Sequence, residues 1–95
     1  GAGMTLGALA NLKLQAGDLT EARQLAEEAR AMRIQVGHRH SLAVAYELLA
    51  RIALREGKPN EAIDFYENAF RVFDSIGNRP SAEQMRAAVT RLTAG

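Results

Sequence analysis

One short sequence pattern occurs twice, and its spacing constrains the fold of the whole chain. Gly17-Asp18-Leu19-Thr20-Glu21-Ala22 and Gly57-Lys58-Pro59-Asn60-Glu61-Ala62 both begin with glycine and end with Glu-Ala, and the second follows the first by 40 residues. Each pattern lies between segments whose apolar residues recur at helical spacing. A glycine in such a place is typical of the tight turn in a helical hairpin, because it adopts the left-handed conformation that ends a helix. The chain is therefore predicted to be an array of stacked helix pairs.

Apolar spacing and turn residues together predict five helices, at residues 4–16, 19–36, 42–56, 59–76 and 82–93. Asp18 is expected to cap the second helix, and Ser41 and Ser81 the third and fifth, since such side chains accept hydrogen bonds from the free N–H groups of a first turn. The third helix is apolar on nearly every side, so neighbours should cover most of it. It is predicted to be the centre of the domain.

These elements define an all-α fold, a right-handed superhelix of stacked antiparallel helix hairpins. Residues 1–95 form one small domain. The first repeat is expected at about 4–37, the second at about 41–77, and a closing helix at about 81–93.

Composition argues against several functional classes. A formal charge of +1 gives no general attraction to nucleic acid or to an anionic membrane, and no apolar run approaches the length of a membrane span. The N-terminus has no signal-peptide pattern. The absence of cysteine excludes disulfides and thiolate metal sites and fits a reducing, cytoplasmic setting. His38 and His40 have no further metal ligands nearby, so they are interpreted as a solvated loop.

No pattern of catalytic residues is present in the sequence. Ser41 and Ser81 lack the glycine-flanked turn of a nucleophilic serine, and no glycine-rich loop is suited to hold a phosphate. The carboxylates of the fourth helix lie on its exposed side rather than in a shielded pair. The chain is therefore predicted not to be an enzyme and to need no cofactor.

The placement of leucine, small residues and glycine resembles the tetratricopeptide repeat family. Each hairpin has a leucine followed by a small residue, a glycine turn, and two alanines seven positions apart: Leu9, Ala10, Gly17, Ala22 and Ala29, then Leu49, Ala50, Gly57, Ala62 and Ala69. Small residues at these places let crossing helices approach closely. The 40-residue period exceeds the usual 34, and no proline closes the repeat. Both features are similar to the longer repeats of arrays in large bacterial signalling and transcription regulators.

The resemblance implies a protein–protein interaction scaffold, or a segment of a larger regulator, that binds a peptide in the concave groove lined by the first helix of each hairpin. It places Asn11, Gln15, Glu47, Arg51, Arg55 and Arg91 in that groove. Asn11, Arg51 and Arg91 occupy equivalent positions, and two arginines in a row favour an acidic peptide, because a guanidinium binds a carboxylate through two hydrogen bonds. The alternative is that these side chains are only the solvated edge of each helix.

Self-association is the rival function. About three helical repeats are usually needed for independent stability, and the sequence supplies about two and a half. The exposed repeat edge of one copy would then complete the stack of another, as a homodimer or a larger oligomer. A third class, a regulatory segment of an enzyme, requires a longer natural chain.

Overall fold

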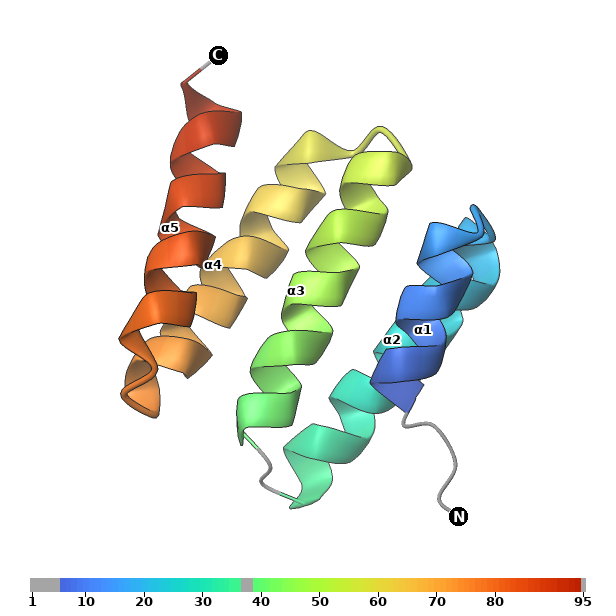
Figure 1. The fold of residues 1–95 in the computed structure, drawn as a ribbon, viewed down its shortest axis with the longest axis horizontal. Coiled ribbons are helices and arrows are strands. Elements are labelled where there is room, and N and C mark those ends of the chain that lie inside the picture. Colours follow the sequence, from blue (N-terminus) through green and yellow to red (C-terminus); the bar gives the residue numbers. More distant parts are fainter. Residues whose placement is uncertain (1–5, 37–38, 95) are drawn as a thin grey trace.

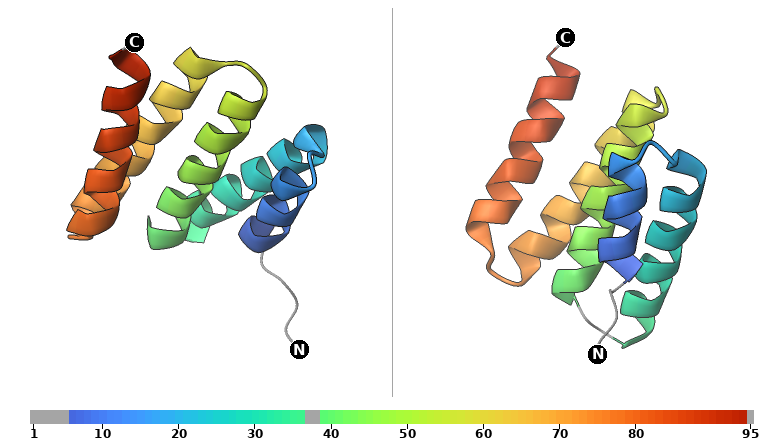
Figure 2. Two further views of the ribbon diagram at one scale, coloured as in Figure 1. Left: turned by 45° about the horizontal axis from the view of Figure 1, so that its top comes forward. Right: turned by 45° about the vertical axis from the view of Figure 1, so that its right-hand side comes forward.

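The computed structural model describes residues 6–36 and 39–94, and the side chains of residues 7–31 and 39–94. Its helices are, in chain order, α1 (Leu6–Gln15), α2 (Leu19–Val36), α3 (Arg39–Arg55), α4 (Pro59–Ser75) and α5 (Arg79–Thr93). They alternate in direction, and Figures 1 and 2 show them side by side from the α1–α2 hairpin to α5. The predicted all-α stack of helix hairpins is confirmed.

The two repeated glycines end their helices as predicted. Gly17 and Gly57 have φ values of 86° and 79°, the left-handed region that side chains with a Cβ rarely occupy. The Gly17 N–H donates to the carbonyl of Leu14, and the next N–H donates to the carbonyl of Lys13. This pair of bonds is the Schellman arrangement, which satisfies carbonyls that have no partner inside the helix. The chain therefore reverses within a few residues and brings consecutive helices into contact.

The starts of two helices differ from the prediction. α3 begins at Arg39 rather than Leu42, so Ser41 lies inside its first turn and is not its cap. α5 begins at Arg79, and its cap is Asn78, whose Oδ1 accepts a hydrogen bond from the Ser81 N–H at 3.3 Å. Asparagine is as good a cap as serine. Pro80 lies within the first turn of α5, where its missing N–H leaves no helical bond unmade, so the helix can begin before it.

The cap of α2 follows the prediction. The Asp18 carboxylate accepts a hydrogen bond from the Glu21 N–H at 3.3 Å. α4 begins at Pro59, as expected for a proline in a first turn. Two expectations lie outside the described residues: the beginning of the first helix before residue 6, and the loop at His38.

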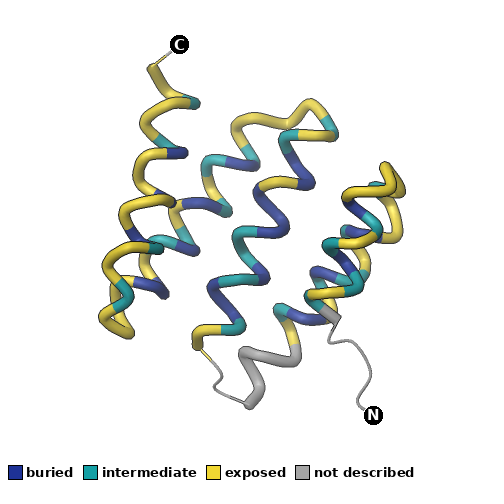
Figure 3. The backbone as a smooth tube through the Cα atoms, viewed as in Figure 1, coloured by how far each residue is buried: buried dark blue, intermediate teal, exposed yellow. Residues whose placement is uncertain are grey.

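α3 lies at the centre of the molecule, as predicted. Leu49 and Ile52 on α3 are fully buried, and together with Ala10 and Leu14 of α1 and Ala22 and Ala26 of α2 they form one apolar cluster. Other α3 side chains, including Ala50 and Ala53, form a second cluster with α4 and α5. Figure 3 shows buried residues along the whole length of α3. The two clusters make α3 the element that joins the first hairpin to the rest of the stack.

Candidate functional site

The first helices of successive hairpins, α1, α3 and α5, lie on the same side of the stack. Figure 1 looks onto this side, with α2 and α4 behind it. We call it the first-helix face, and it is defined by the six predicted groove residues Asn11, Gln15, Glu47, Arg51, Arg55 and Arg91. On α3 the members are spaced by four residues, which places them on one side of that helix.

The charges of Glu47, Arg51 and Arg91 all act on the pKa of one side chain that is not among the predicted site residues. Tyr66 of α4 is buried, with 6% of its surface exposed. Burial raises the pKa of Tyr66 and the negative charge of Glu47 adds to the rise, whereas the positive charges of Arg51 and Arg91 oppose it. Charges from both α3 and α5 therefore act on a buried side chain of α4. Nothing in the local sequence of Tyr66 indicates which charges act on its hydroxyl.

The two equivalent arginines differ from most other basic residues in having no structural partner. Arg51 and Arg91 are exposed, and within the described part of the chain neither side chain takes part in an ion pair or a hydrogen bond. Arg55 is partly engaged, because its Nη1 donates to the Leu14 carbonyl at the end of α1, at 3.4 Å. An arginine that stabilises no internal contact keeps its guanidinium free to bind a ligand.

The two residues that α1 contributes to the first-helix face, Asn11 and Gln15, differ in exposure. Gln15 is exposed, but Asn11 is only half exposed. The Oδ1 atom of Asn11 is buried and accepts no hydrogen bond from any described residue. The structure therefore concentrates the charged part of the face on α3 and α5, and the α1 part offers neutral amides.

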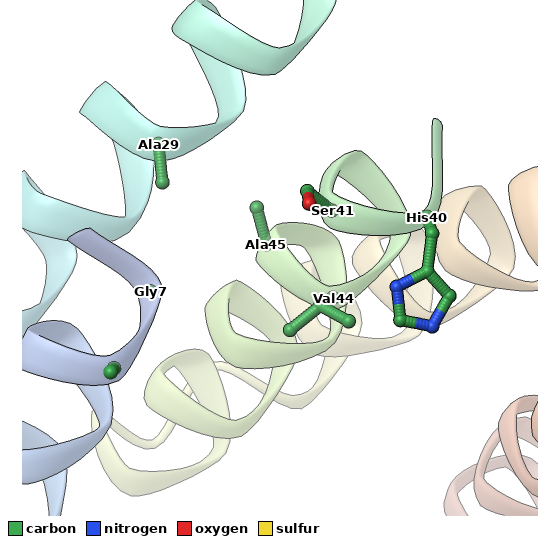
Figure 4. A pocket seen from close by; sticks show the side chains of 7 residues that line it. Gly7, Ala29, His40, Ser41, Val44 and Ala45 are labelled. Carbon is green, nitrogen blue, oxygen red and sulfur yellow. The ribbon is translucent and has the colours of Figure 1, made fainter. Parts of the chain in front are cut away.

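A hollow of about 240 Å³ opens where the N-terminal halves of α1 and α3 meet over α2. Its described lining is mostly apolar and includes Gly7, Ala29, Val44 and Ala45 (Figure 4). Gly7 contributes to the hollow because it has no side chain to fill the space between the helices. Val44 lies three residues before Glu47 on the same side of α3, so the hollow adjoins the charged part of the first-helix face.

The polar residues beside this hollow do not form a catalytic pair. The ring of His40 packs edge-on against Phe73 of α4, with centroids 5.8 Å apart, and Figure 4 shows it directed away from the Ser41 hydroxyl. Within the described residues, no group of three or more His, Asp or Glu side chains is placed to hold a metal ion. The hollow is suited to an apolar side chain rather than to acid–base chemistry.

The strongest charge cluster lies at the turn edge of the stack. Arg23 of α2 binds Glu56 and Glu61 with N–O distances of 2.6 Å each, and its guanidinium lies over the Phe65 ring, 5.9 Å from the centroid. These bonds lower the pKa of Glu56. Helical spacing relates Arg23 only to Glu27, at 3.9 Å, and cannot identify Glu56, which lies 33 residues further along the chain. The cluster joins α2 to the α3–α4 turn and therefore stabilises the stack.

Across residues 6–36 and 39–94, none of the helices combines the length and the apolar character that a membrane-spanning segment needs. Antiparallel helix hairpins that repeat every 40 residues, with glycine turns and alanine contacts, define the chain as a helical repeat protein.

The family model of the tetratricopeptide repeat matches residues 2–75. The chain belongs to the tetratricopeptide repeat family, as its sequence resemblance predicted. The match covers both hairpins and ends before α5. No curated protein and no solved structure matches the chain. Proteins of this family generally mediate protein–protein interaction.

Proposed function

We propose that the chain is a non-enzymatic scaffold whose first-helix face binds an acidic peptide or an acidic segment of a partner protein. The observation that carries the proposal is the pair of exposed arginines, Arg51 and Arg91, which lack internal partners and act on the same phenol. Two such guanidinium groups on the first-helix face favour carboxylates, because each can bind a carboxylate through two charge-assisted hydrogen bonds. The absence of cysteine supports action in a reducing compartment such as the cytoplasm.

The neighbouring hollow supports a more specific form of the peptide. Val44 at the hollow and Arg51 are seven residues apart on α3, a rise of about 10 Å. An extended peptide covers this distance in about three residues. A peptide with an apolar side chain, followed about three positions later by Asp or Glu, would fill the hollow and reach Arg51 together. Glu47 lies between the two and disfavours a further carboxylate there.

The test begins with peptides selected from a random library displayed on phage against the full chain. We expect the selected peptides to be enriched in Asp and Glu, with an apolar residue about three positions away. Arg51→Glu combined with Arg91→Glu should abolish their binding, as followed by fluorescence anisotropy, while circular dichroism shows unchanged helicity.

A matched control separates local recognition from net charge. Arg71→Glu combined with Arg79→Glu makes the same change in formal charge at exposed positions outside the first-helix face, and it should preserve most of the affinity. If both double variants lose binding equally, the effect comes from overall charge and the proposed site is wrong. Light scattering at several concentrations tests the rival function: a concentration-dependent dimer that excludes the peptide would favour self-association.

A further inference from the structure

The buried tyrosine of α4 carries a polar group that the fold does not use. Only 6% of Tyr66 is exposed, yet its hydroxyl forms no hydrogen bond with any described residue. A tyrosine hydroxyl usually has a partner when its ring is buried. Within the described residues, the side-chain polar atom that is both fully buried and unbonded is the Oδ1 of Asn11. The Tyr66 hydroxyl is therefore not sealed in the core, and it ends at the surface of the stack.

The packing of the stack requires the ring of Tyr66 but not its hydroxyl. The ring belongs to the apolar cluster that α3, α4 and α5 share, which also contains Ala50 of α3 and Ala88 of α5. Alanines at these places let the helices approach closely around the ring. The residue 40 positions before Tyr66 is Ala26, which is fully buried and wholly apolar. The hydroxyl is thus free to bind a group outside the stack.

The direction of the side chain takes the hydroxyl toward the first-helix face. α4 lies behind α3 and α5 in Figure 1, and the side of α4 that carries Tyr66 packs against both. A long side chain in a helix points back toward the N-terminus of that helix. Because consecutive helices are antiparallel, the N-terminus of α4 lies at the same end of the stack as the C-termini of α3 and α5. Arg51 and Arg91 belong to the C-terminal halves of these two helices, so the hydroxyl leans toward the end of the face that carries them.

The electrostatics of the face keep this hydroxyl a hydrogen-bond donor. Burial and the charge of Glu47 raise the pKa of Tyr66 above its usual value near 10, so the phenol stays protonated at neutral pH. A protonated phenol has one hydrogen to donate. Arg51 and Arg91 oppose the rise in pKa, which means that two positive charges act on the same hydroxyl. A ligand group attracted by these arginines is an anion, and an anion accepts the hydrogen bond that the phenol offers.

We propose that the Tyr66 hydroxyl is a specificity-determining group of the first-helix face, which donates a hydrogen bond to a ligand carboxylate bound between α3 and α5. Tyr66 adds a residue of a second helix, α4, to a face whose other members belong to first helices, and its role rests on the proposed function. A hydrogen bond to a charged acceptor is stronger than one to a neutral acceptor. The hydroxyl therefore favours Asp or Glu over Asn or Gln in the ligand.

Two peptides blocked at both ends, Leu-Ala-Ala-Asp and Leu-Ala-Ala-Asn, test this role with the full chain. Their affinities are measured by nuclear magnetic resonance titration. Tyr66→Phe keeps the ring and removes the hydroxyl, so it should weaken binding of the Asp peptide roughly 10-fold or more and change binding of the Asn peptide little. Tyr46→Phe is the matched control, because it removes the hydroxyl of a tyrosine that packs against Phe65, with ring centroids 6.4 Å apart. It should leave both affinities unchanged.

The pKa of Tyr66 in the complex provides a second measurement that a purely structural role would not change. The chain has two tyrosines, so in the Tyr46→Phe variant the phenolate absorbance comes from Tyr66 alone. A saturating amount of the Asp peptide should raise the pKa of Tyr66 further, because the carboxylate opposes formation of the phenolate. The Asn peptide should raise it much less. This measurement decides the question even if Tyr66→Phe destabilises the fold.

The outcomes distinguish a failure of this role from a failure of the proposed function. If Arg51→Glu with Arg91→Glu abolishes binding of the Asp peptide but Tyr66→Phe does not weaken it, the face binds acidic peptides without the hydroxyl. Equal weakening of both peptides by Tyr66→Phe, or a pKa of Tyr66 that the Asp peptide leaves unchanged, would also overturn the role of Tyr66. If the Asp peptide does not bind, or binds the double arginine variant equally well, the proposed function and the role of Tyr66 are both wrong.

Discussion

Ile52→Ala and Leu12→Ala make the same type of change at equivalent positions of the two repeats, so they test the stacking directly. Ile52 lies fully buried between α3 and the first hairpin, whereas Leu12 is 46% exposed on the outer side of α1. Both substitutions keep helix-forming residues in a helix interior. Any large difference in their effect therefore reflects packing rather than local helix stability.

The expected magnitudes follow from these exposures. Ile52→Ala removes three buried carbon atoms, each worth about 0.8 kcal/mol of transfer free energy, and it leaves a cavity that α3 cannot close without moving both clusters. The total destabilisation should be about 3–4 kcal/mol. Leu12→Ala removes groups that are already half in water, and it should cost about 1 kcal/mol or less. A domain of 95 residues has roughly 5–14 kcal/mol of stability in total, so the first variant loses a large share of it.

Urea unfolding followed by circular dichroism measures both values. The midpoint for Ile52→Ala should fall strongly without a change in slope, and its thermal midpoint should fall by roughly 12 °C or more. The Leu12→Ala curves should almost overlay those of the unchanged chain. Equal decreases in the free energy of unfolding would refute the proposed arrangement of the stack, because Leu12 of α1 would then be buried in the same way as Ile52 of α3.

Three further predictions concern the turn, the charge cluster and the candidate site. Ala62→Arg should overpack the α3–α4 contact and lower the free energy of unfolding by at least about 1–3 kcal/mol. Lys58→Ala in the same turn should change the free energy of unfolding little. Equal effects would mean that the α3–α4 hairpin is assigned to the wrong residues. Arg23→Gln should destabilise the fold by about 1–3 kcal/mol near neutral pH, and urea titrations should show this difference shrinking in acid. Glu47→Gln should lower the pKa of Tyr66, as followed by phenolate absorbance. An unchanged pKa would mean that the charge of Glu47 does not act on Tyr66.

The effect of Arg23→Gln on the free energy of unfolding should depend on pH in a definite direction. The bonds from Arg23 lower the pKa of Glu56 in the folded chain below its usual value near 4.5. The resulting stabilisation is complete above that value and is lost as the pH falls through the lower folded pKa. Without Arg23 this contribution is absent, so the two chains should converge in stability at low pH.

The raised pKa of Tyr66 makes the free energy of unfolding depend on pH in the opposite direction in alkaline solution. Burial and Glu47 raise it above its usual value near 10 in the folded chain. The stabilisation that follows is complete below that value and is lost as the pH rises through the higher folded pKa. Unfolding free energy should therefore decline in strongly alkaline solution.

The features predicted correctly from the sequence depend on neighbours close in the chain. A glycine between two amphipathic segments ends a helix through its own backbone, so the turns at Gly17 and Gly57 follow from a few residues each. The burial of α3 follows from its lack of a polar side. The predicted first residues of α3 and α5 were wrong because several residues near each helix start can act as its cap. The choice between Asn78 and Ser81 depends on the backbone conformation that the preceding turn imposes.

The features that sequence reasoning missed depend on contacts between distant segments. The bonds of Arg23 to Glu56 and Glu61 need α2 and the α3–α4 turn to meet, and a helical spacing rule cannot supply such a pair. The effect of Arg51 and Arg91 on the pKa of Tyr66 depends on how α3, α4 and α5 pack. Residue type and helix side are enough to propose the residues of the first-helix face, but they do not relate Tyr66 to them.

The central claim is that the first-helix face binds a protein partner, and a nuclear magnetic resonance titration tests it most directly. The ¹⁵N-labelled chain is titrated with an acidic peptide selected from the library, and the changes in amide and arginine side-chain shifts are mapped on the fold. We expect the largest changes at Glu47, Arg51 and Arg91 and around the hollow at Val44. Changes confined to the outer sides of α2 and α4, or to the apolar face at Leu12, would contradict it.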